Sequence, residues 1–216
     1  MIMHVSGKKV QTALLVLVLL VTGGHIAAVA QQRLPPIPLD KMTDAQKTAA
    51  AQYKAERDRE LPTDPYMIML RTPEVMTAWH HIIAHVNSVP LKASAVGRTV
   101  LGDRLAQFAI LINLREWGVM EGEWRGHAQR AEMAGLKPAV VQAVREGRRP
   151  EPMADDESAL WDFYVELSRN KSVSDATYAR ALANLGEAGI VETINIAGLY
   201  IAVGMFHNVA HPARIP

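Results

Sequence analysis

The chain has 216 residues, and its 23 Lys and Arg residues almost balance its 22 Asp and Glu residues. This length predicts one domain, or at most two small ones, and a hydrophobic share of 49% is enough to form a core. The basic residues are scattered, so we expect no nucleic-acid partner; the densest cluster, Arg145, Arg148 and Arg149, follows a predicted helix end, where positive charge offsets the helix dipole. The chain contains no cysteine, which excludes disulfide bonds and thiol catalysis.

The first 30 residues have the features of a signal peptide. Lys8 and Lys9 supply the positive segment, the apolar run 13–21 is too short to span a bilayer, and small residues precede a cleavage site after Ala30. We therefore expect the mature chain to begin at Gln31 and to be exported, either to the periplasm or out of the cell. The alternative is an uncleaved N-terminal anchor.

A proline-rich linker, residues 31–42, is predicted to lead into a helical domain formed by residues 43–216. The prolines fix the backbone and remove hydrogen-bond donors, which favours an extended segment. The first helix is predicted to begin at Thr43, which forms a capping box with Gln46, and to end near Glu60.

Further helices follow from the apolar spacing and from the residues that begin and end helices. Thr72 and Pro73 begin one with apolar residues three and four positions apart, and the segment 105–117 is apolar on almost every side, which predicts a buried helix. The other predicted helices span residues 121–134, 139–146, 155–169 and 174–185.

A turn over residues 186–189 is predicted to precede the last helix, 190–208, which is apolar enough to raise the question of a membrane span. Glu192 would be costly in hydrocarbon, and Gly198 and Gly204 suit close helix packing, so we expect a core helix and no stable membrane span. No segment alternates in the way a strand does. The sequence therefore predicts an all-α fold, a multi-helix bundle.

Three histidines, His80, His81 and His85, raise the question of a metal site because the last two share a helix face. No nearby carboxylate completes a hydrolytic zinc site in the sequence. Solvated histidines on an amphipathic helix explain the pattern equally well, and we expect no bound metal.

The strongest candidate for chemistry is the pair Glu123 and His127. Residues four apart on a helix share a face, so the carboxylate can reach the imidazole, and Trp124 can shield the pair from water. A shielded imidazole beside a carboxylate is suited to proton transfer. A surface ion pair of little energetic value is the alternative.

Other residues of the chain offer less chemistry. The serines lack the Gly-x-Ser-x-Gly elbow of a hydrolase, so a serine triad is not supported. Tyr200 and Asn208 are polar positions in the apolar last helix, where they could contact a ligand or act as a buried hydroxyl group and a helix cap.

Several segments, in this order, resemble the carboxymuconolactone decarboxylase family, which is related to alkylhydroperoxidase D. They are RLAQFAIL, GEWRGH followed by AGL, SDATYARALANLGEAGIVE, and the GLY stretch that leads to Asn208. The resemblance covers residues 67–208. It implies the all-helical bundle of that family, assembled into homo-oligomers, trimers or hexamers, with the active site near subunit contacts.

The resemblance assigns roles to particular residues. His127 matches the histidine of the family, and Glu123 and Trp124 match the residues that precede it in members without cysteine. The peroxidase branch has a Cys-x-x-Cys pair at positions that correspond here to Met120 and Glu123, so thiol-based peroxide reduction is not available to this chain. The chain has Gln107 where the family usually carries a glutamate.

A glutamine cannot act as a base, so Glu116 or Glu121 could replace the missing carboxylate. The leading hypothesis is a cofactor-free decarboxylase that acts on a small carboxylated lactone or oxo acid, with His127 and Glu123 as catalytic residues. The residues expected to bind the substrate are Trp124, Tyr200, Asn208 and Gln107. The second hypothesis is a non-catalytic, oligomeric small-molecule binding protein of the same fold.

Overall fold

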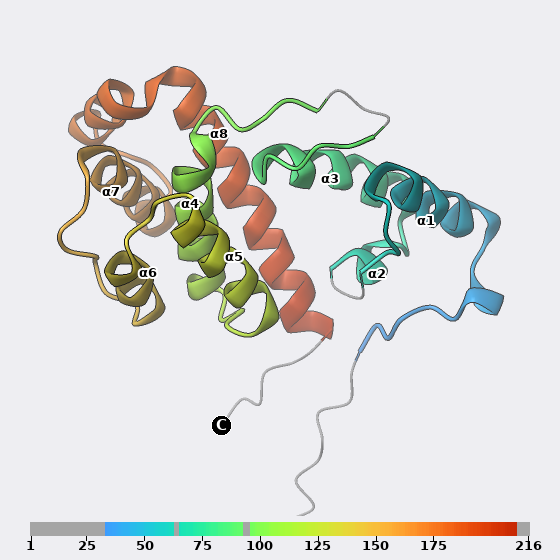
Figure 1. Ribbon diagram of the computed structural model, residues 1–216. Coiled ribbons are helices and arrows are strands. Elements are labelled where there is room, and N and C mark those ends of the chain that lie inside the picture. The colour runs from blue at the N-terminus through green and yellow to red at the C-terminus, as the bar shows by residue number, and fades with distance from the viewer. Residues whose placement is uncertain (1–32, 63–64, 93–95, 211–216) are drawn as a thin grey trace, which may run out of the picture.

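The computed structural model describes residues 33–62, 65–92 and 96–210, and every regular element within these ranges is helical (Figure 1). The prediction of an all-α fold is confirmed, whereas the predicted signal peptide lies outside the described residues. The elements are a 3-10 helix, Leu39–Lys41, and the helices α1 (Asp44–Arg57), α2 (Tyr66–Met69), α3 (Pro73–Val86), α4 (Gly102–Glu116), α5 (Gly122–Met133), α6 (Pro138–Arg145), α7 (Asp155–Asn170) and α8 (Asp175–Ala210).

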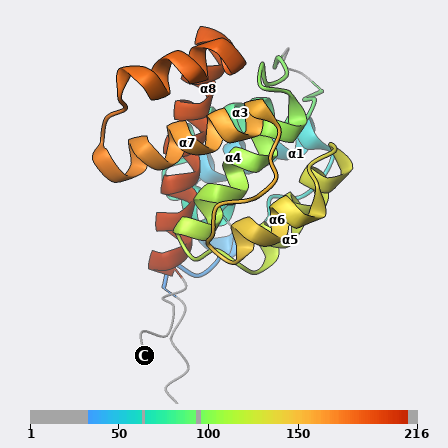
Figure 2. The same cartoon turned by 90° about the vertical axis from the view of Figure 1, so that its left-hand side faces the viewer.

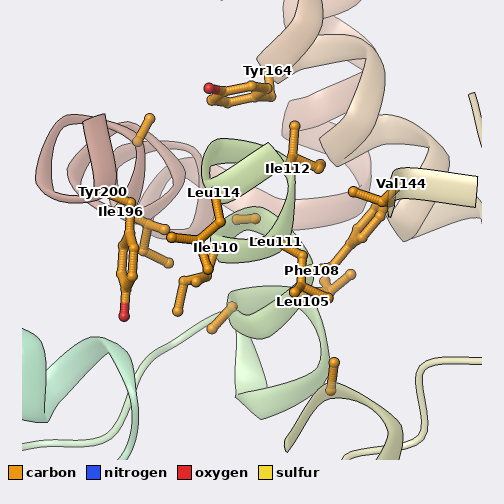
Figure 3. Close-up of a cluster of buried hydrophobic side chains, with 14 of the residues drawn as sticks. Leu105, Phe108, Ile110, Leu111, Ile112, Leu114, Val144, Tyr164, Ile196 and Tyr200 are labelled. Carbon is orange, nitrogen blue, oxygen red and sulfur yellow. The ribbon is translucent and has the colours of Figure 1, made fainter. Parts of the chain in front are cut away.

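The central helix of the larger part of the fold is α4. Every residue from Leu105 to Leu114 is buried, and α5, α6, α7 and α8 all pack against this helix. Figure 3 shows its apolar side chains between those of α6, α7 and α8. The nearly continuous apolar sequence of this segment therefore reflects burial on all sides, as expected.

The helix α8 has two arms that meet at Gly186. This residue has φ 69° and ψ 171°, in the left-handed half of backbone space, which glycine enters at little cost. The predicted turn over residues 186–189 is therefore confined to one residue. The shorter arm packs with α7, and the longer arm, drawn in red, runs beside α4 (Figures 1 and 2).

By length and composition alone, α8 could cross a membrane. An 18-residue window has a mean hydropathy of 1.6, and 56% of that window is buried inside the fold. The buried residues include Glu192 and Thr193, and the contacts with α4 and α7 account for the apolar positions. The expectation that α8 is a core helix is consistent with this packing, and the absence of a membrane span stays a prediction.

The helices α1, α2 and α3 form a smaller part of the fold with its own apolar cluster. Tyr53 and Met76 are buried in this cluster, and Trp79 and Ile83 of α3 also contact the core around α4. Met42, the last residue of the predicted linker, is buried here too. In Figure 1, α1 and α2 lie on the right of α8, and α6 and α7 lie on its left.

Two details of this smaller part differ from the sequence predictions. The first helix ends at Arg57 rather than near Glu60, because Asp58 adopts φ 57°, a left-handed conformation that short polar side chains tolerate. The single helical turn α2 was not predicted, since its four residues are too few to show a helical period.

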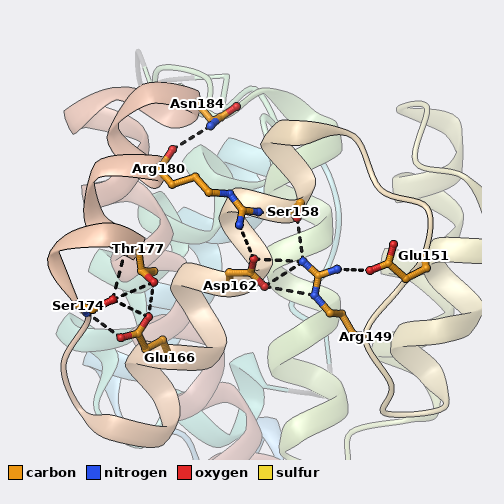
Figure 4. A network of polar contacts seen from close by, with 9 residues as sticks. All are labelled: Arg149, Glu151, Ser158, Asp162, Glu166, Ser174, Thr177, Arg180 and Asn184. Atoms are coloured by element: carbon orange, nitrogen blue, oxygen red, sulfur yellow. Dashed lines mark hydrogen bonds and ion pairs between the residues drawn. The ribbon is translucent and has the colours of Figure 1, made fainter.

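Ion pairs of Arg149 hold the segment that joins α6 to α7 against α7 (Figure 4). Arg149 Nη2 lies 3.1 Å from Asp162 Oδ1, and Arg149 also contacts Glu151. Asp162 is shared with Arg180 of α8, at 2.8 Å. Arg149, which belongs to the densest basic cluster of the sequence, therefore serves the fold.

The two glycines predicted to permit close packing on α8 differ in their surroundings. A Cβ atom at Gly204 would lie 2.5 Å from Cβ of Trp117, whereas one at Gly198 would meet no atom within 4 Å. Only Gly204 is therefore needed for close packing within the chain.

We predict that Gly204→Ala destabilises the protein and that Gly198→Ala does not. Overpacking costs about 1–3 kcal/mol, which exceeds the roughly 0.5–1 kcal/mol that alanine gains over glycine inside a helix. Denaturant unfolding of the two variants measures the difference. Equal stabilities would contradict the packing of Gly204 on Trp117.

Candidate active site

A cavity of about 280 Å³ lies between the smaller part of the fold and the helices α5 and α8. Glu123, His127 and Tyr200 all line it, so the acid/base pair and the tyrosine singled out from the sequence meet at one place. Its size is close to the lower limit of small-molecule sites. The cavity also receives side chains from α1 and α3, which the sequence did not connect with the site.

A ring of four hydrogen-bonded side chains, three of which line this cavity, lies at one side of it, and we call it the polar ring. Its members are Asn87, Gln107, His127 and Tyr200. Asn87 Nδ2 donates to the Tyr200 hydroxyl oxygen at 3.0 Å, and Gln107 Nε2 donates to Asn87 Oδ1 at 3.1 Å. His127 Nδ1 lies 2.7 Å from Gln107 Oε1, and the Tyr200 hydroxyl lies 3.3 Å from His127 Nε2. Each member comes from, or directly follows, a different helix, α3, α4, α5 or α8.

The backbone fixes the direction of donation around the polar ring. Asn87 Nδ2 also donates to the carbonyl oxygen of Ile83 at 3.0 Å, and a carbonyl can only accept. The amide oxygen of Asn87 must therefore face Gln107, and the amide oxygen of Gln107 must face His127. It follows that His127 carries its proton on Nδ1, while Nε2 holds a lone pair that accepts from the Tyr200 hydroxyl.

Arg130 is the other neighbour of the imidazole. Its Nη2 atom lies 3.0 Å from His127 Nδ1, so it could donate only if Nδ1 were unprotonated. In that case Gln107 Oε1, which is closer, would face a lone pair instead of a donor. We therefore assign the proton of Nδ1 to the bond with Gln107 and regard Arg130 as a neighbouring positive charge.

The environment keeps His127 neutral. The ring is 2% exposed, and burial lowers the pKa of His127 because a charged imidazole would lose its hydration. The charge of Arg130 also lowers this pKa, whereas Glu123 opposes the shift. At neutral pH the Nε2 lone pair is consequently available to accept a proton.

Glu123 lies beside this lone pair, with its Oε2 atom 3.5 Å from His127 Nε2. Burial acts to raise the pKa of Glu123, but the contact with His127 and the charges of His207 and Arg130 outweigh it, so that the pKa is lowered. The carboxylate is therefore ionised at neutral pH. Two proton acceptors stand next to each other, an arrangement that favours a proton or a ligand donor between them.

Tyr200 is a donor and not an acid in this site. Burial raises the pKa of its hydroxyl group, and the charge of Glu123 acts in the same direction, although the bond from Asn87 opposes both. Its ring meets that of His127 edge-on, with centroids 5.3 Å apart. The prediction that Tyr200 lines the pocket agrees with its position in the cavity.

The structure gives three other predicted residues different places. Trp124 is buried in the apolar core and does not line the cavity, so its predicted role as a wall is not supported. Asn208 caps the carbonyl of Trp117 at 2.9 Å, also away from the cavity, because the end of α8 extends beyond it. Gln107 contacts His127 and is not among the residues that line the cavity, so its position suits orienting the imidazole, and its predicted contact with substrate stays a prediction.

The carboxylates proposed to replace the missing family glutamate do not reach the cavity. Glu116 accepts hydrogen bonds from Tyr164, at 2.6 Å, and Ser168, at 2.7 Å. Glu121 is the exposed cap residue of α5. Of the three carboxylates considered, only Glu123 lies beside the imidazole.

Asn87, Arg130, Arg57 and Arg59 are site residues that the sequence analysis missed. Asn87 resembles an ordinary residue at a helix end, and it is the C-cap of α3. Arg130 lies three positions after His127, and this spacing was the one available signal. The other two arginines lie far from the site in sequence, so only the folded chain brings them there.

The three histidines of α3 have carboxylate partners, and only His80 departs from the solvated position expected for them, since His81 and His85 remain partly exposed. His80 Nε2 and His81 Nε2 each lie 3.1 Å from Glu56 Oε2, and His85 Nε2 lies 2.9 Å from Glu192 Oε1. His80 is 1% exposed, and burial lowers its pKa to about 4. Among the described residues, no group of three or more such side chains is arranged to hold a metal ion.

A larger and more open groove, of about 1050 Å³, lies between α3 and α8, away from the polar ring. Its lining is mainly apolar and includes Ile82, Val191 and Ile194, which are 44%, 57% and 46% exposed. Exposed apolar residues that gather on one face are typical of an interaction surface.

Comparisons with protein-family models, with curated proteins and with solved structures found no match to this chain. The geometry of the site and the sequence segments described above are therefore what bears on the function of this chain.

We predict that His127 makes the fold sensitive to acid. The pKa of His127 is lower in the folded chain than in the unfolded one, so below about pH 6.5 the unfolded chain binds more protons than the folded chain. The free energy of unfolding therefore decreases as the pH is lowered below that value. His127→Asn keeps a donor towards Gln107 but cannot titrate.

Denaturant unfolding at pH 7 and pH 5.5 measures this effect, and both pH values lie above the range in which Glu123 titrates. The wild type should lose more stability between them than His127→Asn does, since the other histidines contribute to both proteins. An equal loss would mean that His127 is not shielded from water.

Proposed function

We propose that this protein is a cofactor-free lyase of the carboxymuconolactone decarboxylase type, acting on a small carboxylated lactone or oxo acid. The observation that carries the proposal is the buried His127, oriented by Gln107, whose Nε2 atom lies 3.5 Å from the Glu123 carboxylate at the wall of a small cavity. An oriented imidazole of lowered pKa is suited to general acid/base catalysis.

Decarboxylation of such an acid consumes one proton. The C–C bond to the carboxylate breaks, carbon dioxide leaves, and the electron pair moves into the adjacent unsaturated lactone or oxo group. His127 would take a proton from solvent on Nε2, with Glu123 stabilising the resulting imidazolium at 3.5 Å, and would then deliver that proton to carbon. Tyr200, which stays protonated, could donate a hydrogen bond to the oxygen that gains charge.

The amide of Gln107 suits this role better than the carboxylate that the family usually carries. A glutamate at this position could not donate to Asn87 Oδ1, so the polar ring would lose a bond. A second negative charge beside the imidazole would also raise the pKa of His127. Gln107 therefore supports a neutral imidazole, which fits a site that must first take up a proton.

The second candidate is a non-catalytic binding protein with the same cavity. Gln107 favours this candidate, because an amide cannot act as a base. Glu123 is the one carboxylate among the described residues that line the cavity. Release of carbon dioxide from a bound acid separates the two candidates.

We predict that His127→Ala lowers kcat/KM for carbon dioxide release by about 10²-fold or more, the usual contribution of a general acid or base. The matched control is His85→Asn, which alters a histidine–glutamate pair outside the cavity and should leave turnover unchanged. The substrate is first found by a thermal-shift screen of small acids. Full activity of His127→Ala would exclude the proposed mechanism.

We also propose that the chain is exported and forms a homo-oligomer, a trimer or hexamer. The apolar groove between α3 and α8 supports the second part, because Val191 and Ile194 expose large apolar side chains there.

Two aspartates at these positions should therefore separate the subunits. We predict that Val191→Asp with Ile194→Asp reduces the mass measured by light scattering to that of one chain, because charges are costly in an apolar interface. The wild type eluting as a single chain would contradict the proposed oligomer.

A further inference from the structure

Acidic and basic residues alternate from Glu56, in the last turn of α1, to Glu60, three residues beyond that helix, and all three acidic residues have partners. Glu56 contacts two histidines of α3, as described above. Asp58 binds Lys92, with Oδ2 and Nζ 2.8 Å apart, and Glu60 forms an ion pair with Lys54. The two arginines between these acids are therefore left without the neighbours that would ordinarily neutralise them.

Arg57 and Arg59 line the cavity instead. Among the described residues neither forms an ion pair, and the one hydrogen bond to either guanidinium group runs from Arg59 Nε to the Tyr53 hydroxyl oxygen, at 3.1 Å. The left-handed turn at Asp58 ends the helix between them and allows both side chains to reach the same cavity.

The charge of the cavity lining is consequently unbalanced. Arg130 also lines the cavity, so three arginines line it, and among the described residues Glu123 is the one carboxylate in the lining. Positive groups gathered around a small cavity with apolar walls create a strong local potential that attracts anions. A guanidinium group binds a carboxylate through two parallel hydrogen bonds, which adds geometric selectivity.

We propose that Arg57 and Arg59, together with Arg130, bind a carboxylate group of the ligand and make the site selective for small organic acids. This inference rests on the proposed function and adds specificity residues to it. Arg57 and Arg59 lie before residue 67, outside the segment that resembles the family, so the C-terminal end of α1 and the residues just after it supply this selectivity to a site built by α3, α4, α5 and α8.

The test compares small acids with their methyl esters, which have almost the same shape but no charge. The probes are 5-oxotetrahydrofuran-3-carboxylate, levulinate, 2-oxoglutarate and benzoate, measured by calorimetry on the full mature chain at low salt. At least one acid should bind at least ten-fold more tightly than its ester, and added salt should weaken its binding.

Arg57→Gln, and the double variant that adds Arg59→Gln, should weaken the binding of that acid by ten-fold or more and leave the affinity for the ester unchanged. Arg57→Lys keeps the charge but not the planar donor pair, so its affinity for the acid should lie between those of the wild type and Arg57→Gln. Arg125→Gln is the matched control, because Arg125 is exposed on α5 and does not line the cavity. Circular dichroism confirms that each variant is folded.

Equal affinity for acid and ester, no binding of any acid by the wild type, or unchanged affinity in the double variant would each overturn the inference. The proposed lyase activity fails separately, when a bound acid releases no carbon dioxide. Binding without release would leave the role of the arginines intact.

Discussion

The direction of hydrogen bonding around the polar ring is the constraint on which the site depends. A backbone carbonyl, that of Ile83, decides which way Asn87 points, and this choice passes through Gln107 to the imidazole of His127. Four side chains from four parts of the fold must meet for this to happen, so correct packing of α3, α4, α5 and α8 is itself the condition for an oriented histidine. Loss of any member would leave buried polar groups unpaired, which is costly.

The charges around this ring favour both the uptake of a proton and the binding of an anion. Burial and Arg130 keep His127 neutral, and Glu123 remains ionised beside its lone pair. Arg57 at the end of α1, Arg59 just after it and Arg130 of α5 add positive charge to the same cavity. A small organic acid entering it would meet guanidinium groups for its carboxylate and an imidazole able to take up the proton that decarboxylation consumes.

Much of the fold followed from the sequence, because helix ends and apolar periodicity are local. The buried segment around Leu111 and the break near Gly186 were predicted on that basis, and both are present. The approach of Glu123 to His127 was predictable for the same reason, as a spacing of four on one helix. Asn87 and Arg57 could not be predicted as site residues, since they precede His127 by 40 and 70 residues in the sequence and reach the site only in the folded chain. Trp124 shows the opposite error: its place beside the pair in sequence suggested a pocket wall, but the helix turns it into the core.

The most direct test of this account is the protonation of His127, read from the ¹⁵N chemical shifts of its two ring nitrogens at pH 7.5. The polar ring predicts a proton on Nδ1 and a bare Nε2, and Asn87→Ala should weaken that preference because it removes the group that fixes Gln107. A proton on Nε2 in the wild type, shared with Glu123, would contradict the account, since the lone pair would then face Gln107 and not the cavity.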